Sequence, residues 1–72
     1  MEDRLTLLAS TFDPLEAEIW CKALEEEGIA VLLRQDDPLG PLGLHLGARY
    51  EIYVFRGEER RARFVLGLGT DG

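Results

Sequence analysis

Hydrophobic and polar residues follow a regular pattern in five segments of this chain, in the order strand, helix, strand, strand, helix. The first segment, Arg4 to Ala9, alternates imperfectly, with Leu5 and Leu7 on one side and Thr6 and Leu8 on the other. Such alternation is typical of a strand that is covered on one face. The pattern therefore predicts that the chain begins with a strand.

The second segment predicts a helix over Pro14 to Glu27. Asp13 is a favoured N-cap residue, Pro14 suits the first helical position, and Glu16 completes a D-x-x-E capping box. Gly28 is expected to end this helix. Apolar residues recur at spacings of three and four and predict its core-facing side: Ala17, Trp20 and Leu24, flanked by Cys21 and Ala23.

A wholly apolar run, Ile29 to Leu33, follows the helix and predicts the second strand, which Arg34 ends. Because a short helix joins the first two strands, we expect them to run parallel with a right-handed crossover. A continuous apolar run is typical of a strand that is buried on both faces. We therefore expect this strand at the centre of the sheet.

The segment Gln35 to Gly47 holds two of the three prolines and three of the eight glycines, which predicts a long loop. Loops of this length tend to be functional or disordered. Four leucines in one loop are poorly suited to water, so we expect them to pack over the sheet or to contact a partner. They are Leu39, Leu42, Leu44 and Leu46.

The third strand, Ala48 to Phe55, alternates most clearly. One face carries Tyr50, Ile52 and Val54, and the other carries Arg49, Glu51, Tyr53 and Phe55. A second helix is predicted from the acidic pair Glu58 and Glu59 to Gly67, with an apolar stripe formed by Ala62, Val65 and Leu66.

These elements predict one α+β domain over residues 1–72, with its core in residues 4–66 and a frayed tail in residues 67–72. The expected architecture is a two-layer α/β sandwich of the ferredoxin-like or half-ferredoxin-like type. Both helices lie on one face of a three-stranded sheet, and a fourth strand in the tail is the alternative. We expect the other face of the sheet to be open.

Size and charge narrow the class of partner. A core in a 72-residue chain supplies only about 3–5 kcal/mol, so a partner subunit is the expected supplement, and a homodimer is the simplest form. The net charge of −6 argues against nucleic acid as a partner. No apolar run is long enough to span a membrane, and the acidic start is unlike a secretory signal, so we expect a cytoplasmic protein.

The sequence offers few candidates for chemistry. Cys21, the only cysteine, lies beside the apolar helical stripe and is expected to be a buried, inert thiol. We therefore expect no catalytic residue, no metal and no cofactor. The polar residues that could still contact a small ligand are Asp36, His45, Arg56, Arg60 and Arg63.

Two functions from different classes remain open. The first is a non-enzymatic protein-interaction or regulatory module that uses exposed apolar surface. Its candidate interface residues are Leu39, Leu42, Leu44, Leu46, Tyr53 and Phe55. The alternative is a small-ligand or metal-sensing domain that uses the loop over residues 35–47 and the arginine face formed by Arg56, Arg60 and Arg63.

The chain also resembles a family of small bacterial domains of unknown function, catalogued as prokaryotic signal-transducing proteins. The similar features are F-D-P-x-E-A-E at the start of the first helix, L-E-x-E-G-I at its end, and a V-x-L-R strand, within residues 4–66. The resemblance implies a ferredoxin-like sandwich like that of nitrogen-regulatory proteins, and a signalling role. It implies no catalytic residue.

Overall fold

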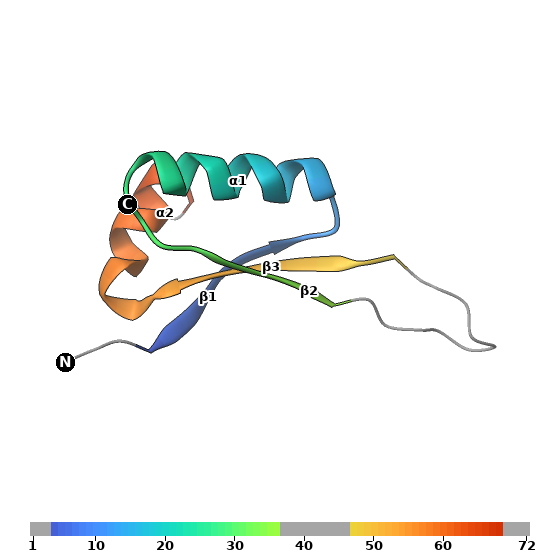
Figure 1. The fold of residues 1–72 in the computed structure, drawn as a ribbon, viewed down its shortest axis with the longest axis horizontal. Helices are drawn as coiled ribbons and strands as arrows, with labels where there is room; N and C mark the ends of the chain where they lie inside the picture. Colours follow the sequence, from blue (N-terminus) through green and yellow to red (C-terminus); the bar gives the residue numbers. More distant parts are fainter. Residues whose placement is uncertain (1–3, 37–46, 69–72) are drawn as a thin grey trace.

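The computed structural model describes residues 4–36 and 47–68. The described elements follow the order strand, helix, strand, strand, helix, with a 3-10 turn before the last helix, and form an α+β fold (Figure 1). They are β1 (Leu5–Thr11), α1 (Pro14–Glu26), β2 (Leu32–Asp36), β3 (Arg49–Phe55), η2 (Arg56–Glu58) and α2 (Glu59–Leu66). The predicted order is confirmed, and the architecture is compatible with a half-ferredoxin-like fold.

The described residues form a three-stranded sheet with the order β1-β3-β2. Both outer strands pair antiparallel with β3, so β1 and β2 run parallel to each other as predicted. The expected central position of the second strand is wrong, because β3 lies between the other two. The expected burial on both faces is wrong too, because every residue of this edge strand is exposed. An apolar run does not show which strands pair with it.

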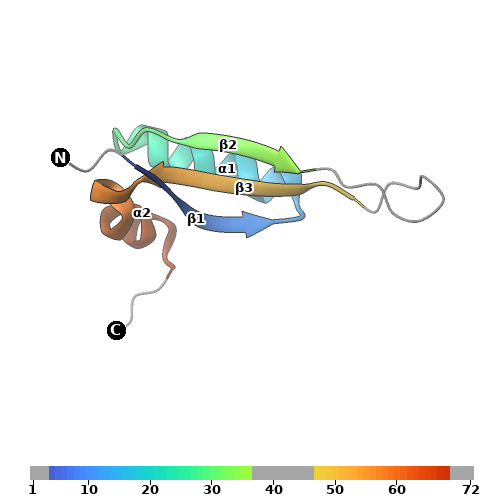
Figure 2. The ribbon, with the colours of Figure 1, turned by 90° about the horizontal axis from the view of Figure 1, so that it is seen from below.

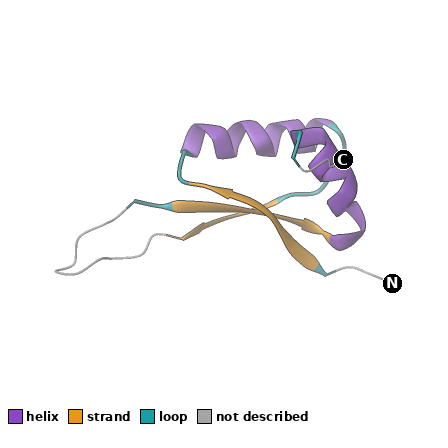
Figure 3. Cartoon of the chain, turned by 180° about the vertical axis from the view of Figure 1, so that it is seen from behind, coloured by secondary structure: helices purple, strands orange, loops and turns teal. Residues whose placement is uncertain are grey.

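The two helices cover the same face of the sheet, which gives two layers (Figures 1 and 3). The four largest fully buried side chains lie between these layers: Leu24 of α1, Ile29, and Ile52 and Val54 of β3. Three smaller contributions complete the buried core, from Leu8, Ala17 and Ala62. The predicted core faces of both helices and of the third strand are confirmed.

The start of α1 is fixed by three side chains. Asp13 Oδ1 accepts a hydrogen bond from the Leu15 N–H at 3.0 Å, which confirms Asp13 as the N-cap. Glu16 does not return a direct bond to Asp13. Instead the Thr11 hydroxyl accepts from the Asp13 N–H at 3.0 Å and donates to Glu16 Oε1 at 2.6 Å. The predicted capping box is therefore wrong, because the Thr11 hydroxyl takes the place of Glu16 as the acceptor for the Asp13 N–H.

The end of α1 explains why the second strand begins later than predicted. Gly28 has a φ of 79°, its N–H donates to the Glu25 carbonyl, and the Ile29 N–H donates to the Leu24 carbonyl. This pair of bonds is a Schellman motif, in which the residue after the glycine packs on the last helical turn. Ile29 is thus buried as part of the helix end. The predicted strand over Ile29 to Leu33 is corrected to Leu32–Asp36.

The second helix follows β3 almost directly. Gly67 ends it with a φ of 72°, and the Leu68 N–H donates to the Arg63 carbonyl. Arg61 Nη2 donates to the Glu27 carbonyl at 2.6 Å, which joins α2 to the C-terminal end of α1. This bond holds the two helices together at one end of the layer.

Candidate functional site

The face of the sheet away from the helices is the candidate site, and it is turned toward the reader in Figure 2. We call it the open face. In an antiparallel sheet, residues directly opposite each other place their side chains on the same face. Because Ile52 and Val54 point into the core, their neighbours along β3 and the partners of those neighbours form the open face. Its members are Leu5, Leu7, Ser10, Leu32, Arg34, Asp36, Arg49, Glu51, Tyr53 and Phe55.

One half of the open face is apolar. Leu7, Tyr53 and Leu32 lie directly opposite one another across the three strands, and Leu5 lies opposite Phe55 in the next row. Leu5 and Leu7 are each 45% exposed, Leu32 48% and Phe55 39%. Apolar side chains that are gathered in two adjacent rows and left this exposed are typical of a contact surface. We call these five residues the apolar half.

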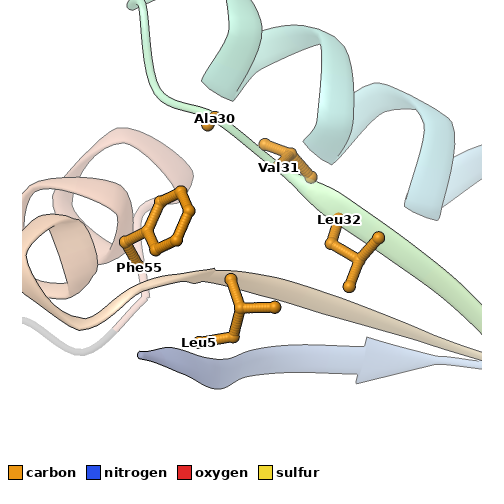
Figure 4. A pocket seen from close by; sticks show the side chains of 5 residues that line it. All are labelled: Leu5, Ala30, Val31, Leu32 and Phe55. Carbon is orange, nitrogen blue, oxygen red and sulfur yellow. The ribbon is translucent and has the colours of Figure 1, made fainter. Parts of the chain in front are cut away.

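A hollow of about 190 Å³ lies at the end of the apolar half (Figure 4). Its walls are formed by Leu5, Leu32 and Phe55 of the sheet and by Ala30 and Val31, which precede β2. The hollow exists because β2 pairs with β3 only from Leu32 onward, so β2 has not yet joined the sheet beside Phe55. It is smaller than the roughly 300–1,000 Å³ of a pocket for a small molecule. Its size and lining suit an inserted apolar side chain.

The other half of the open face is polar and is organised around Glu51. This carboxylate is 8% exposed, although it lies on the face without helices. Arg49 Nη2 donates to Glu51 Oε2 at 3.0 Å, and the Tyr53 hydroxyl donates to Glu51 Oε1 at 3.1 Å. The residues two positions before and after Glu51 thus hold both of its oxygens, which fixes the Tyr53 ring at the border of the apolar half.

Charges on the open face balance. Arg34 lies directly opposite Glu51, and Asp36 lies directly opposite Arg49, so two cations and two anions alternate. The helix side differs, because residues 13–27 hold six acidic residues and one lysine. The protein has a net charge of −6, but the charged residues of the open face, beside the apolar half, carry no excess of negative charge.

Only part of the predicted interface lies in the described residues. Tyr53 and Phe55 lie on the open face, in the apolar half. The four loop leucines, Leu39, Leu42, Leu44 and Leu46, and the ligand candidate His45 lie outside the described residues. Their predicted roles stay predictions.

The remaining ligand candidates are not brought together. Asp36 lies opposite Arg49 at one end of β3, whereas Arg56 follows the other end of that strand, about 20 Å away at 3.3 Å per residue. Arg63 is paired with Glu59 at 3.6 Å. Arg60 is exposed on α2. Asp36 and Arg56 therefore do not belong to a common binding site.

Cys21 is half-buried against the core, and so less buried than the sequence predicted. Burial, and secondarily the Glu25 carboxylate, raise the pKa of the Cys21 thiol. A raised pKa keeps the thiol protonated and weakly nucleophilic. Within residues 4–36 and 47–68, no group of three or more histidine, cysteine or acidic residues is arranged to hold a metal ion. No helix in these same ranges is long and apolar enough to cross a membrane.

Two groups of exposed apolar residues were not predicted from the sequence. Leu5, Leu7 and Leu32 join the open face. Leu32 belongs to an apolar run, and such a run is typical of a strand that is buried on both faces. Leu15 and Ile19 are 62% and 57% exposed on the outer side of α1. Their i, i+4 spacing, opposite Ala17 and Leu24 on the helix, is a signal that could have identified them.

Comparisons of this chain with protein-family models, with curated proteins and with solved structures found no match. The resemblance to signal-transducing domains therefore stays a prediction from the residues quoted above.

Proposed function

We propose that this chain is a non-enzymatic protein-interaction module of regulatory type, and that the apolar half of the open face is its contact surface. The observation that carries the proposal is the pair of adjacent rows formed by Leu5, Leu7, Leu32, Tyr53 and Phe55, which end in an apolar hollow. A protein contact needs an apolar centre and a polar rim. The polar half, with its balanced charges, supplies one side of that rim.

The chemistry of the partner follows from the surface. The open face suits an apolar protein surface with a protruding side chain, because the hollow has apolar walls and adjoins Phe55. A strongly basic partner would be attracted to the acidic helix side. The open face is neutral and does not favour such a partner. We also propose a cytoplasmic location, since the single cysteine and the absence of a long apolar run fit that compartment.

The alternative, a small-ligand or metal sensor, has weaker support. Asp36 and Arg56 lie at opposite ends of the sheet, and Arg63 is already paired with Glu59. The hollow has apolar walls and lies at the opposite end of β3 from Asp36. The resemblance to signalling domains agrees with an interaction module and adds no binding residue.

A pair of charge substitutions tests the proposal. Leu7→Asp places a carboxylate in the middle row of the apolar half, and Ile19→Asp places one at a similarly exposed position on α1. We expect Leu7→Asp to lose the proteins that wild type retains from a host-cell extract in quantitative affinity enrichment, and Ile19→Asp to retain them. Equal retention by both variants would contradict the assignment of the open face.

A further inference from the structure

The outer edge of β2 presents main-chain groups that have no partner within residues 4–36 and 47–68, and one hydrogen bond shows which groups these are. The Arg56 N–H donates to the Arg4 carbonyl at 2.8 Å, and these residues lie opposite each other one step beyond Leu5 and Phe55. In an antiparallel ladder, opposite residues alternate between pairs that exchange hydrogen bonds and pairs that do not. The main-chain groups of Arg56 point toward β1, so those of Phe55 point the other way. Tyr53 lies two residues before Phe55, and its main-chain groups therefore also point away from β1, toward β2.

The same alternation then assigns the groups of β2. Leu32, Arg34 and Asp36 pair with Tyr53, Glu51 and Arg49, so their N–H and C=O groups point inward. The N–H and C=O groups of Leu33 and Gln35 point outward, away from β3. Every residue of β2 is exposed, and Leu33 is exposed by 45% although its side chain lies on the helix side of the sheet.

The two edges of the sheet differ in how well they resist pairing. On β1, the register with β3 shifts between Leu7 and Ala9, so Leu8 is the extra residue of a β-bulge. Bulges are one of the devices by which natural proteins protect sheet edges. The pairing of β2 with β3 is regular from Leu32 to Asp36, and this strand contains no proline. The edge of β2 is thus the one suited to accept another strand.

We propose that β2 pairs antiparallel with β2 of a second copy of this chain, forming a continuous six-stranded sheet. The charges of β2 favour a second copy, because one arginine and one aspartate leave this edge neutral on a chain of net charge −6. Each added hydrogen bond uses a main-chain group that already points outward. The proposal is independent of what covers the open face.

Charge also selects the register. A two-fold axis at Arg34 sets two guanidinium groups directly opposite each other, which is destabilising. An axis at Leu33 pairs all of residues 30–36 and sets Leu33 opposite its copy. In that register, Arg34 lies opposite Leu32 of the second copy, and Gln35 lies opposite Val31 of the second copy. The Leu33 register is the one that we assign, because it separates the two Arg34 side chains and covers the exposed Leu33 with its copy.

A proline substitution tests the edge without breaking the sheet. The Gln35 N–H points outward, so Gln35→Pro removes a donor to the second copy and none to β3. Gln35→Thr is the matched control, because it keeps the N–H and suits a strand. In analytical ultracentrifugation of the full chain we expect a dimer for wild type and for Gln35→Thr. We expect association to be weakened about tenfold or more in Gln35→Pro.

Disulfide formation tests the register, and it also covers the case in which the proline variant fails to fold. In a Cys21→Ala background, Leu33→Cys places two thiols opposite each other at the roughly 5.5 Å Cα separation that a disulfide tolerates. Arg34→Cys is the control, since its Cα atoms are then more than about 7 Å apart. We expect a covalent dimer from Leu33→Cys alone. A wild-type monomer at every concentration, or cross-linking through Arg34→Cys instead, would overturn the proposal.

Discussion

Arg61 on α2 donates a hydrogen bond from its guanidinium to the main-chain carbonyl of Glu27 at 2.6 Å, across 34 positions of sequence. Glu27 is the C-cap of α1, where carbonyl groups lack helical partners and the helix dipole is negative. A cation at this point satisfies a carbonyl and offsets the dipole. Arg61 also pairs with Glu58 at 3.3 Å, which orients its side chain.

We predict that Arg61→Ala lowers the free energy of unfolding by about 1 kcal/mol, because a half-exposed hydrogen bond from a charged group contributes about that much. The adjacent Arg60→Ala is the control, since Arg60 is exposed and makes no contact of this kind in the described residues. Urea unfolding followed by circular dichroism measures both. Equal losses from the two variants would show that the Glu27 bond contributes nothing.

Gly28 and Gly57 provide a matched pair for the backbone. Both have open space where a Cβ would be placed, but only Gly28 has a positive φ, of 79°. We expect Gly28→Ala to cost about 1 kcal/mol of stability, because an alanine is strained in that conformation. Gly57→Ala is expected to be neutral or to stabilise by about 0.5 kcal/mol. Thermal unfolding of the two variants compares them, and a neutral Gly28→Ala would contradict the role given to the Schellman motif.

Leu24 is the best-buried residue of α1, at 0% exposure. Leu24→Ala is expected to cost about 2–5 kcal/mol. Because a core of this size supplies only about 3–5 kcal/mol, this substitution is expected to remove a large part of the stability. Leu15→Ala, on the exposed side of the same helix, should change stability by less than about 0.5 kcal/mol. Urea unfolding followed by near-ultraviolet circular dichroism of Trp20 measures both variants. A loss of less than about 2 kcal/mol from Leu24→Ala would contradict this estimate.

The raised pKa of Cys21 predicts a dependence of stability on pH. Burial and Glu25 favour the protonated thiol in the folded chain, so the unfolded chain loses this proton at a lower pH. The stabilisation is complete below the ordinary thiol pKa and is lost as the pH rises through the raised pKa of the folded protein. Cys21→Ala should remove this decline from a series of urea unfolding curves at alkaline pH. An unchanged decline in that variant would assign it to other groups.

The described helices and β3 could be predicted because their signals are local. Asp13, Pro14 and Gly28 mark the two ends of α1, and the alternation around Ile52 assigns the faces of β3. The hydrogen bonds before the first helical turn could not be predicted from Asp13 and Glu16 alone, since the Thr11 hydroxyl bridges these two residues. Such a bridge depends on where β1 ends, which the capping pattern alone does not specify.

The position of β2 could not be predicted, because it depends on contacts between distant segments. Ile29 has the same apolar character as Leu32, yet Ile29 packs on Leu24 at the helix end and Leu32 lies on the open face. Sequence periodicity does not distinguish these two environments. The candidate site was for that reason only half predicted, from Tyr53 and Phe55.

Photo-cross-linking from single aromatic positions tests most directly whether another protein covers the open face. Benzoylphenylalanine replaces Phe55, in the apolar half, or Phe64, which is 80% exposed on α2. Irradiated host cells should yield discrete cross-linked protein bands from the Phe55 position and none from the Phe64 position, although Phe64 is the more exposed. Bands from the Phe64 position alone, or none from Phe55, would contradict the account.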